Sequence, residues 1–162
     1  MTKKELLQSV IDTLKKNMES AEERLKTIVQ AAVDAPGAMQ SYSDTTKSQM
    51  GQIADELQRS LTEQSLTLGI LQSMVSSYSL FDDVGCVKIG SFVEVLDENT
   101  EREFYLILPA GGGIEISDQG REILVISSHA PIATALIGKK PGEKIGLKIG
   151  QLQRNLTIVN IQ

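Results

Sequence analysis

The chain has 162 residues and a formal net charge of −5, with a sequence pI near 4.9, which argues against a sequence-independent DNA binder. Aromatic residues make up only 4% and tryptophan is absent, so a base-stacking surface is not expected. The apolar residues form no run long enough for a membrane helix, the charged N-terminus is unlike a signal peptide, and the single Cys86 excludes an internal disulfide. These features predict a cytoplasmic protein without membrane association.

The first helix is predicted from apolar residues whose spacing alternates between four and three. This heptad pattern indicates a helix from about Lys3 to Asp34, roughly 48 Å long at about 1.5 Å per residue. The seam consists of Leu7, Ile11, Leu14, Met18, Ala21, Leu25, Ile28 and Ala32.

A break follows this helix, because Pro36 disfavours a helix interior and Gly37 permits a sharp turn. A second helix is expected to start near Asp44, with Ser43 or Asp44 as its N-cap. Its seam again alternates by four and three and consists of Met50, Ala54, Leu57, Leu61, Gln64, Leu68, Leu71, Val75 and Tyr78. Gln64 is the polar residue of this seam, and a buried polar group of this kind can fix helix register.

Two long helices of matched length joined by a short connection predict an antiparallel coiled-coil hairpin over residues 1–78, with its tip at about 34–44. A compact helical bundle is the alternative. The hairpin is favoured because the two narrow seams satisfy each other and no third long helix follows.

The second half, residues 79–162, contains ten of the 13 glycines and three of the four prolines, which indicates a β-rich domain. Its pattern predicts an α+β arrangement in which one short helix packs on an antiparallel, strongly curved sheet. The expected strands cover residues 90–96, 102–108, 122–127, 145–149 and 154–161, with a further β-rich segment at 84–89 and a helix at 130–137.

The stretch from Ser128 to Ile145 resembles the C-terminal signature of the Gre transcript-cleavage and elongation factors. The matching residues are Pro131, Ala133, Ala135, Leu136, Gly138, Lys139, Gly142 and Glu143, and residues 90–100 resemble the opening strand and hairpin of the same domain. The resemblance implies an FKBP-like second domain that docks on bacterial RNA polymerase at the rim of its secondary channel. It assigns that docking to His129, Ala130, Pro131 and Ile132. Thr134 stands where the family carries arginine.

In the family that this chain resembles, two acidic residues three apart at the hairpin tip help to hold a Mg²⁺ ion in the polymerase active site. Mg²⁺ prefers hard oxygen ligands, which carboxylates provide. Here Asp44 falls at the position of the second acid, while Ser41 occupies the position of the first. Asp34 lies across the loop and is a candidate for the second carboxylate, although its spacing differs from that of the family pattern. An N-cap is the alternative role of Asp44. The remaining expected tip contacts are Met39, Tyr42 and Ser43.

The sequence therefore predicts a monomeric, Gre-like regulator of transcription that is not an enzyme by itself. It is expected to bind no cofactor alone, and at most to share Mg²⁺ with RNA polymerase during transcript cleavage. A chaperone-like or scaffold module, whose hairpin binds a protein client through exposed tip residues such as Met39 and Tyr42, is the alternative function.

Overall fold

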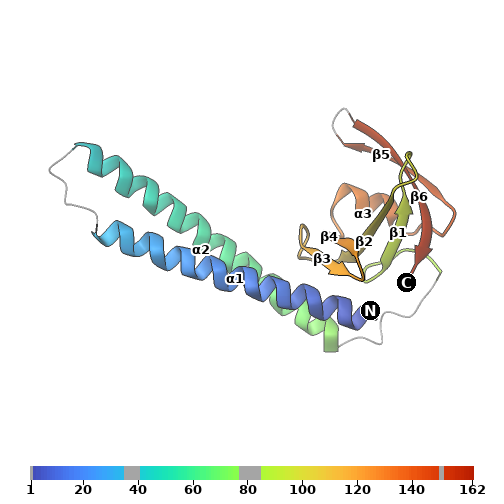
Figure 1. The fold of residues 1–162 in the computed structure, drawn as a ribbon, viewed down its shortest axis with the longest axis horizontal. Helices are drawn as coiled ribbons and strands as arrows, with labels where there is room; N and C mark the ends of the chain where they lie inside the picture. Colours follow the sequence, from blue (N-terminus) through green and yellow to red (C-terminus); the bar gives the residue numbers. More distant parts are fainter. Residues whose placement is uncertain (1, 35–40, 77–84, 150–151) are drawn as a thin grey trace.

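The computed structural model describes residues 2–34, 41–76, 85–149 and 152–162, and its elements form a long helical hairpin attached to a six-stranded sheet (Figure 1). The helices are α1 (Lys3–Asp34), α2 (Ser41–Ser76) and α3 (Pro131–Leu136). The strands are β1 (Phe92–Leu96), β2 (Arg102–Leu108), β3 (Glu115–Asp118), β4 (Arg121–Ser127), β5 (Lys144–Ile149) and β6 (Leu152–Ile161). None of the described helices combines the length and the apolar character that a membrane crossing requires.

Helix α1 has the predicted bounds, and its start is explained by a reciprocal cap. The Glu5 backbone N–H donates to the Thr2 hydroxyl oxygen over 3.3 Å, while the Thr2 backbone nitrogen donates to the Glu5 carboxylate over 2.7 Å. This arrangement satisfies two backbone donors that the helix leaves free at its first turn. The Thr2 hydrogen bonds also lower the pKa of the Glu5 carboxyl.

Helix α2 begins at Ser41, three residues before the predicted start. The prediction that Ser43 or Asp44 forms the N-cap is therefore wrong, because both residues lie within the first turn. The pattern did not reveal this because residues 41–46 carry no apolar seam residue. The helix ends at Ser76, and the predicted domain boundary at 78–79 lies outside the described residues.

The strand order of the sheet is β3-β4-β2-β1-β6-β5. All neighbouring strands are antiparallel except β2 and β4, which are parallel, so the predicted antiparallel sheet is confirmed apart from this pair. The cause is the short strand β3, which the sequence pattern did not predict. It reverses the chain through a tight turn at Gln119 and Gly120, both with positive φ, before β4 begins.

The β-rich segment at 84–89 forms no strand in its described part, which begins at Gly85. Val87 is nevertheless buried and exchanges backbone hydrogen bonds with the segment after α3. Its N–H donates to the Lys139 carbonyl over 2.8 Å, and its carbonyl accepts from the Gly138 N–H over 2.7 Å. The segment is therefore held by a local bridge, with glycines of positive φ at Gly85 and Gly90.

The sheet separates two apolar cores. On one face, the first four turns of α1 and part of α2 pack against the sheet and bury Leu6, Leu7, Val10, Ile11, Leu14, Leu71, Phe92, Leu106, Leu108, Ile114, Ile116, Ile123 and Val125. On the opposite face, α3 covers Val87, Val93, Val95, Tyr105, Ile107, Ile126, Ile145, Leu147, Leu156, Ile158 and Ile161. The base of the hairpin and the sheet therefore share one core.

Gln64 lies on α2 beside the glycine loop formed by residues 111–113. Its side-chain amide nitrogen donates to the Ser60 hydroxyl oxygen over 3.2 Å, while its Oε1 is buried without a hydrogen-bond partner among the described residues. Together with Leu14, Asn17 and the loop it lines a cavity of about 330 Å³. Gly111 has φ +83°, and a Cβ there would meet the Thr67 methyl at 3.4 Å, so the loop approaches α2 closely.

Candidate functional site

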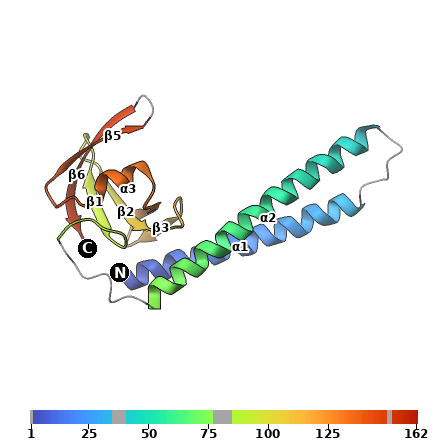
Figure 2. The same ribbon diagram turned by 180° about the vertical axis from the view of Figure 1, so that it is seen from behind.

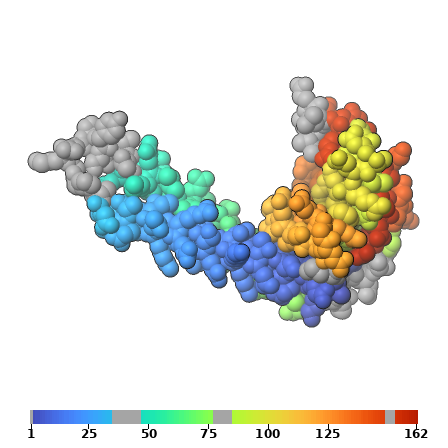
Figure 3. Space-filling model, viewed as in Figure 1, coloured from blue at the N-terminus to red at the C-terminus, as the bar shows by residue number. Residues whose placement is uncertain are grey.

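The hairpin extends well beyond the sheet (Figures 1 and 3). Within α1, the fully buried residues are confined to its first 14 positions, and the later seam residues Met18, Leu25 and Ile28 are only half-buried. Grooves of about 480 and 620 Å³ line the two sides of this distal part. The distal hairpin is therefore a two-helix projection that is covered by no other described element, and Figure 2 shows the same from behind.

The tip residues are placed as follows. Asp34 ends α1 and is exposed, and both of its carboxylate oxygens accept from the Gln30 side-chain amide over 2.9 and 3.0 Å. Ser41 and Asp44 stand three residues apart in the first turn of α2. Met39 lies outside the described residues, and the side chains of 41–46, which include Tyr42 and Ser43, lie outside them as well.

The spacing at the tip bears on metal binding. The chain has a single carboxylate in the Ser41 and Asp44 pair, so this pair does not reproduce two acidic ligands three residues apart. Within the described ranges, no group of three or more His, Cys, Asp or Glu side chains could hold a metal ion. The Ser41 and Asp44 pair by itself therefore supplies one anionic ligand, and a role of Asp44 at a shared Mg²⁺ ion stays a prediction.

The predicted docking residues span the end of the turn after β4 and the start of α3, because His129 and Ala130 precede the helix while Pro131 and Ile132 are its first two residues. His129 and Pro131 are exposed, whereas Ala130 and Ile132 are half-buried against the core under α3. The turn is fixed by backbone hydrogen bonds, because the Ser128 N–H donates to the Leu108 carbonyl over 2.7 Å and the Ala130 N–H donates to Ser127 over 2.9 Å. Pro131 starts α3, where its missing N–H costs no helical hydrogen bond. The four residues are thus presented together where a hydrogen-bonded turn meets the first turn of α3.

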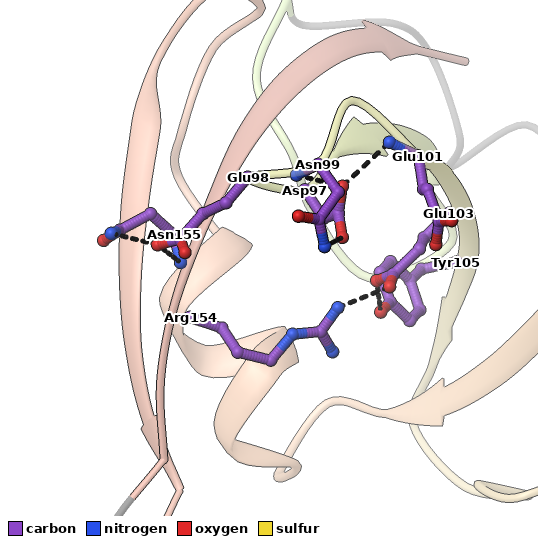
Figure 4. Close-up of polar contacts among 8 residues, drawn as sticks. All are labelled: Asp97, Glu98, Asn99, Glu101, Glu103, Tyr105, Arg154 and Asn155. Carbon is purple, nitrogen blue, oxygen red and sulfur yellow. Dashed lines mark hydrogen bonds and ion pairs between the residues drawn. The ribbon is translucent and has the colours of Figure 1, made fainter.

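A polar network that sequence reasoning missed lies on the face of the sheet covered by α3 (Figure 4). The Glu103 carboxylate on β2 accepts from the Tyr105 hydroxyl and from the Arg154 guanidinium on β6. Burial, followed by the contact with Glu103, raises the pKa of Tyr105. The same carboxylate raises the pKa of Arg154. No local pattern connects residues 51 positions apart, so the sequence carried no signal for this contact.

The turn between β1 and β2 is organised next to this network. The Asp97 carboxylate accepts from the backbone N–H groups of Asn99 and Glu101, each over 2.8 Å, which closes the turn around a side chain. Glu98 accepts from the backbone and side-chain nitrogens of Asn155 on β6. The turn is therefore fastened to a strand that is not its sequence neighbour (Figure 4).

Comparisons with known proteins give a consistent picture. The family model described as "Transcription elongation factor, GreA/GreB, C-term" matches residues 82–162, which is half of the chain. The chain is 25% identical over 151 residues to "Transcription elongation factor GreA" of Cereibacter sphaeroides, covering 87% of this chain and 93% of that protein. It is 30% identical over 97 residues to the protein of the same description from Clostridium kluyveri, covering 57% of each chain.

Among solved structures, the chain is similar to the GreA factor homolog 1 (Gfh1) protein of Thermus thermophilus. The superposition covers 94% of each chain with 19% sequence identity and a TM-score of 0.38.

Proposed function

This chain belongs to the GreA/GreB family of transcription elongation factors, and we propose that it binds RNA polymerase at the rim of the secondary channel and extends its hairpin inward. The observation that supports this proposal most directly is the uncovered distal hairpin. It consists of two long helices whose α1 seam residues are half-buried in this part, and no other described element covers them. A projection of this kind suits a narrow channel, because it carries its tip far from the domain that docks.

The dimensions of the hairpin support the proposal. Helices α1 and α2 contain 32 and 36 residues, which correspond to roughly 48 and 54 Å at about 1.5 Å per residue. Their base is fixed to the sheet through the shared core. The position of the tip is therefore set by the docking of the sheet domain, since a paired and anchored hairpin has little freedom to bend.

The docking role falls on the turn His129, Ala130, Pro131 and Ile132. Two of these residues are exposed, and the other two are anchored in the core under α3. A surface of this kind offers a pre-organised contact with little conformational entropy to lose on binding. Thr134, which follows in α3, is exposed and donates its hydroxyl to the Ala130 carbonyl over 3.1 Å.

At the tip, the pair of positions three residues apart carries one carboxylate, Asp44, and this points to regulation by occupancy. Ser41 supplies a neutral hydroxyl, which is a weak ligand for Mg²⁺ compared with a carboxylate. The protein would therefore regulate elongation, pausing or initiation and stimulate transcript cleavage little. It would act as an accessory factor, since any cleavage is the chemistry of the polymerase. The client-binding alternative is not favoured by membership of this family.

The test is RNA cleavage in purified, backtracked polymerase complexes with and without this protein. We expect little stimulation by the natural protein and inhibition of a second cleavage factor that uses the same channel. The variant Ser41→Asp should gain stimulation by about tenfold or more, because it completes two carboxylates three residues apart. The matched control Ser43→Asp adds the same charge at a different spacing and should gain none.

Three outcomes of these experiments would contradict parts of the proposed function. Strong stimulation by the natural protein that Asp44→Ala abolishes would show that one tip carboxylate suffices for cleavage. Equal gains from Ser41→Asp and Ser43→Asp would show that the spacing is irrelevant. Absence of binding to polymerase, measured by co-sedimentation, would overturn the proposed function.

A further inference from the structure

Strand β5 forms one edge of the sheet, and its only neighbour in the strand order is β6 (Figure 1). The register pairs Lys144 with Thr157, Gly146 with Asn155 and Lys148 with Gln153. Among the described residues, the backbone of Lys144–Lys148 bonds only to β6. The second side of this strand therefore carries backbone donors and acceptors that are available to another strand.

The hydrogen-bond pattern between β5 and β6 shows which backbone groups of β5 are available. The Ile158 N–H donates to the Glu143 carbonyl over 3.0 Å, so the pair one step before the ladder is hydrogen-bonded. Hydrogen-bonded and non-hydrogen-bonded pairs alternate along an antiparallel ladder. Ile145 and Leu147 are therefore the residues bonded to β6, while the N–H and C=O groups of Lys144, Gly146 and Lys148 face the open edge.

The side chains of β5 alternate between the two faces of the sheet. Ile145 and Leu147 are buried in the core under α3, and Lys144, Gly146 and Lys148 are exposed on the opposite face of the strand. Side chains of successive residues point to opposite faces of a sheet. A strand added at this edge would thus have one row of its side chains beside Lys144 and Lys148.

The local charge is opposite in sign to that of the whole chain. Residues 139–148 contain four lysines and one glutamate, whereas the complete chain has a net charge of −5. Lys139 and Lys140 lie in the turn that leads into β5, and Lys139 forms only a long ion pair of 3.9 Å with Glu143. An acidic ligand would therefore be attracted to this end of an otherwise acidic protein.

We propose that the open edge of β5 binds an extended acidic peptide segment of a partner protein by strand addition. The backbone groups of Lys144, Gly146 and Lys148 would supply main-chain hydrogen bonds, and the two lysines would select carboxylates four residues apart. A second copy of this chain is disfavoured as the occupant. Antiparallel pairing of two β5 strands about Gly146 places Lys144 directly opposite Lys148 of the other copy, and such like-charge pairs are destabilising.

The probe is a labelled peptide, acetyl-Thr-Glu-Val-Thr-Val-Glu-Thr-amide, which places its two glutamates on one face of a strand. We expect the isolated full-length protein to bind it in a fluorescence-polarisation titration. We also expect slower hydrogen exchange of the amides of Lys144, Gly146 and Lys148, with little change at Ile145 and Leu147. The experiment uses no polymerase, so its result is independent of the proposed function.

Matched variants of the protein and of the peptide distinguish the contribution of charge from that of main-chain hydrogen bonds. The variant Lys144→Glu with Lys148→Glu should weaken binding by about tenfold or more and should bind the same peptide with lysines in place of glutamates. The control Lys15→Glu with Lys16→Glu changes the charge equally at exposed positions of α1 and should bind as the natural protein does. N-methylation of the central threonine removes a donor that faces β5 and should abolish binding. N-methylation of the first valine, whose N–H faces away, should be tolerated.

Several results would overturn the proposal. Absence of binding would mean that the lysines only shield the edge against association. Equal binding of both N-methylated peptides would show that charge alone acts. Tighter, lysine-dependent binding of a single-stranded oligonucleotide would assign the surface to nucleic acid.

Discussion

At the scale of single side chains, Glu103 joins polar groups of two different strands of the sheet. It accepts from the buried Tyr105 hydroxyl and from Arg154, which comes from a strand two places away in the sheet. Removing one partner of a buried hydrogen bond leaves the other with its desolvation penalty. Glu103 should therefore matter more for stability than its half-exposed position on the strand suggests.

The raised pKa of Tyr105 gives this contact a pH dependence. Above the ordinary tyrosine pKa of about 10 the unfolded chain releases its proton, while folded Tyr105 keeps it, so the stability falls as the pH rises. We expect Tyr105→Phe to lose less stability than the natural protein between pH 8 and pH 11. The difference should approach about 1.4 kcal/mol at pH 11.

Urea denaturation of both proteins at the two pH values measures this difference. An identical loss in the natural protein and Tyr105→Phe would show that Tyr105 titrates equally in the folded and unfolded chain.

At the scale of elements, the periodic segments could be predicted from the sequence, whereas the short ones could not. The seam through Leu7, Leu14 and Leu25 predicted α1 with its observed bounds. Strand β3 has four residues with one buried side chain, Ile116, so it carried too little pattern to be recognised. Its absence from the prediction also hid the parallel pairing of β2 with β4.

The residues of the candidate site likewise divide into those that could be predicted from the sequence and those that could not. The rigid turn at Pro131 carries residue types that identify it without a structure, because proline at a helix start is a local signal. The contact of Glu103 with Arg154 depends on the strand order, which no local signal gives. The tip residues Ser41 and Asp44 could be recognised by resemblance alone, and their roles stay predictions.

The packing of the hairpin on the sheet leads to a prediction about α2. Leu71 is fully buried, and its methyl group lies 3.5 Å from where a Cβ on Gly111 would stand, whereas Leu66 on the same helix is 67% exposed. Leu71→Ala should lower the free energy of unfolding by about 2–5 kcal/mol, because it leaves a cavity in the core shared with the sheet. Leu66→Ala should change it by less than about 0.5 kcal/mol.

Urea denaturation followed by circular dichroism compares the two variants. Because helices and strands share this core, Leu71→Ala should destabilise both in one transition. Equal effects of the two substitutions, or loss of helix signal alone, would contradict a core that joins the hairpin to the sheet.

At the scale of the whole molecule, the length of the hairpin separates the proposed docking residues from the tip. The proposed docking residues near Pro131 belong to the sheet domain, while the tip lies at the opposite end of two helices of 32 and 36 residues (Figure 1). If the proposed function is correct, shortening the hairpin in whole heptads preserves the seam and the docking surface but withdraws the tip. Deleting residues 22–28 together with 55–61 removes one heptad from each helix and about 10 Å of reach.

We expect this shortened protein to bind polymerase within about threefold of the natural affinity, because the residues of the shared core and of the docking turn stay in place. Its effect on elongation, measured as the lifetime of a defined pause, should be lost, since the tip no longer reaches the active centre. Deleting residues 22–28 alone puts the two seams out of register and should reduce the helical signal, which makes it a control for disruption of the hairpin. If the in-register deletion acted on the pause as strongly as the natural protein, the regulation would come from the docked domain, and the protruding hairpin would not be its working part.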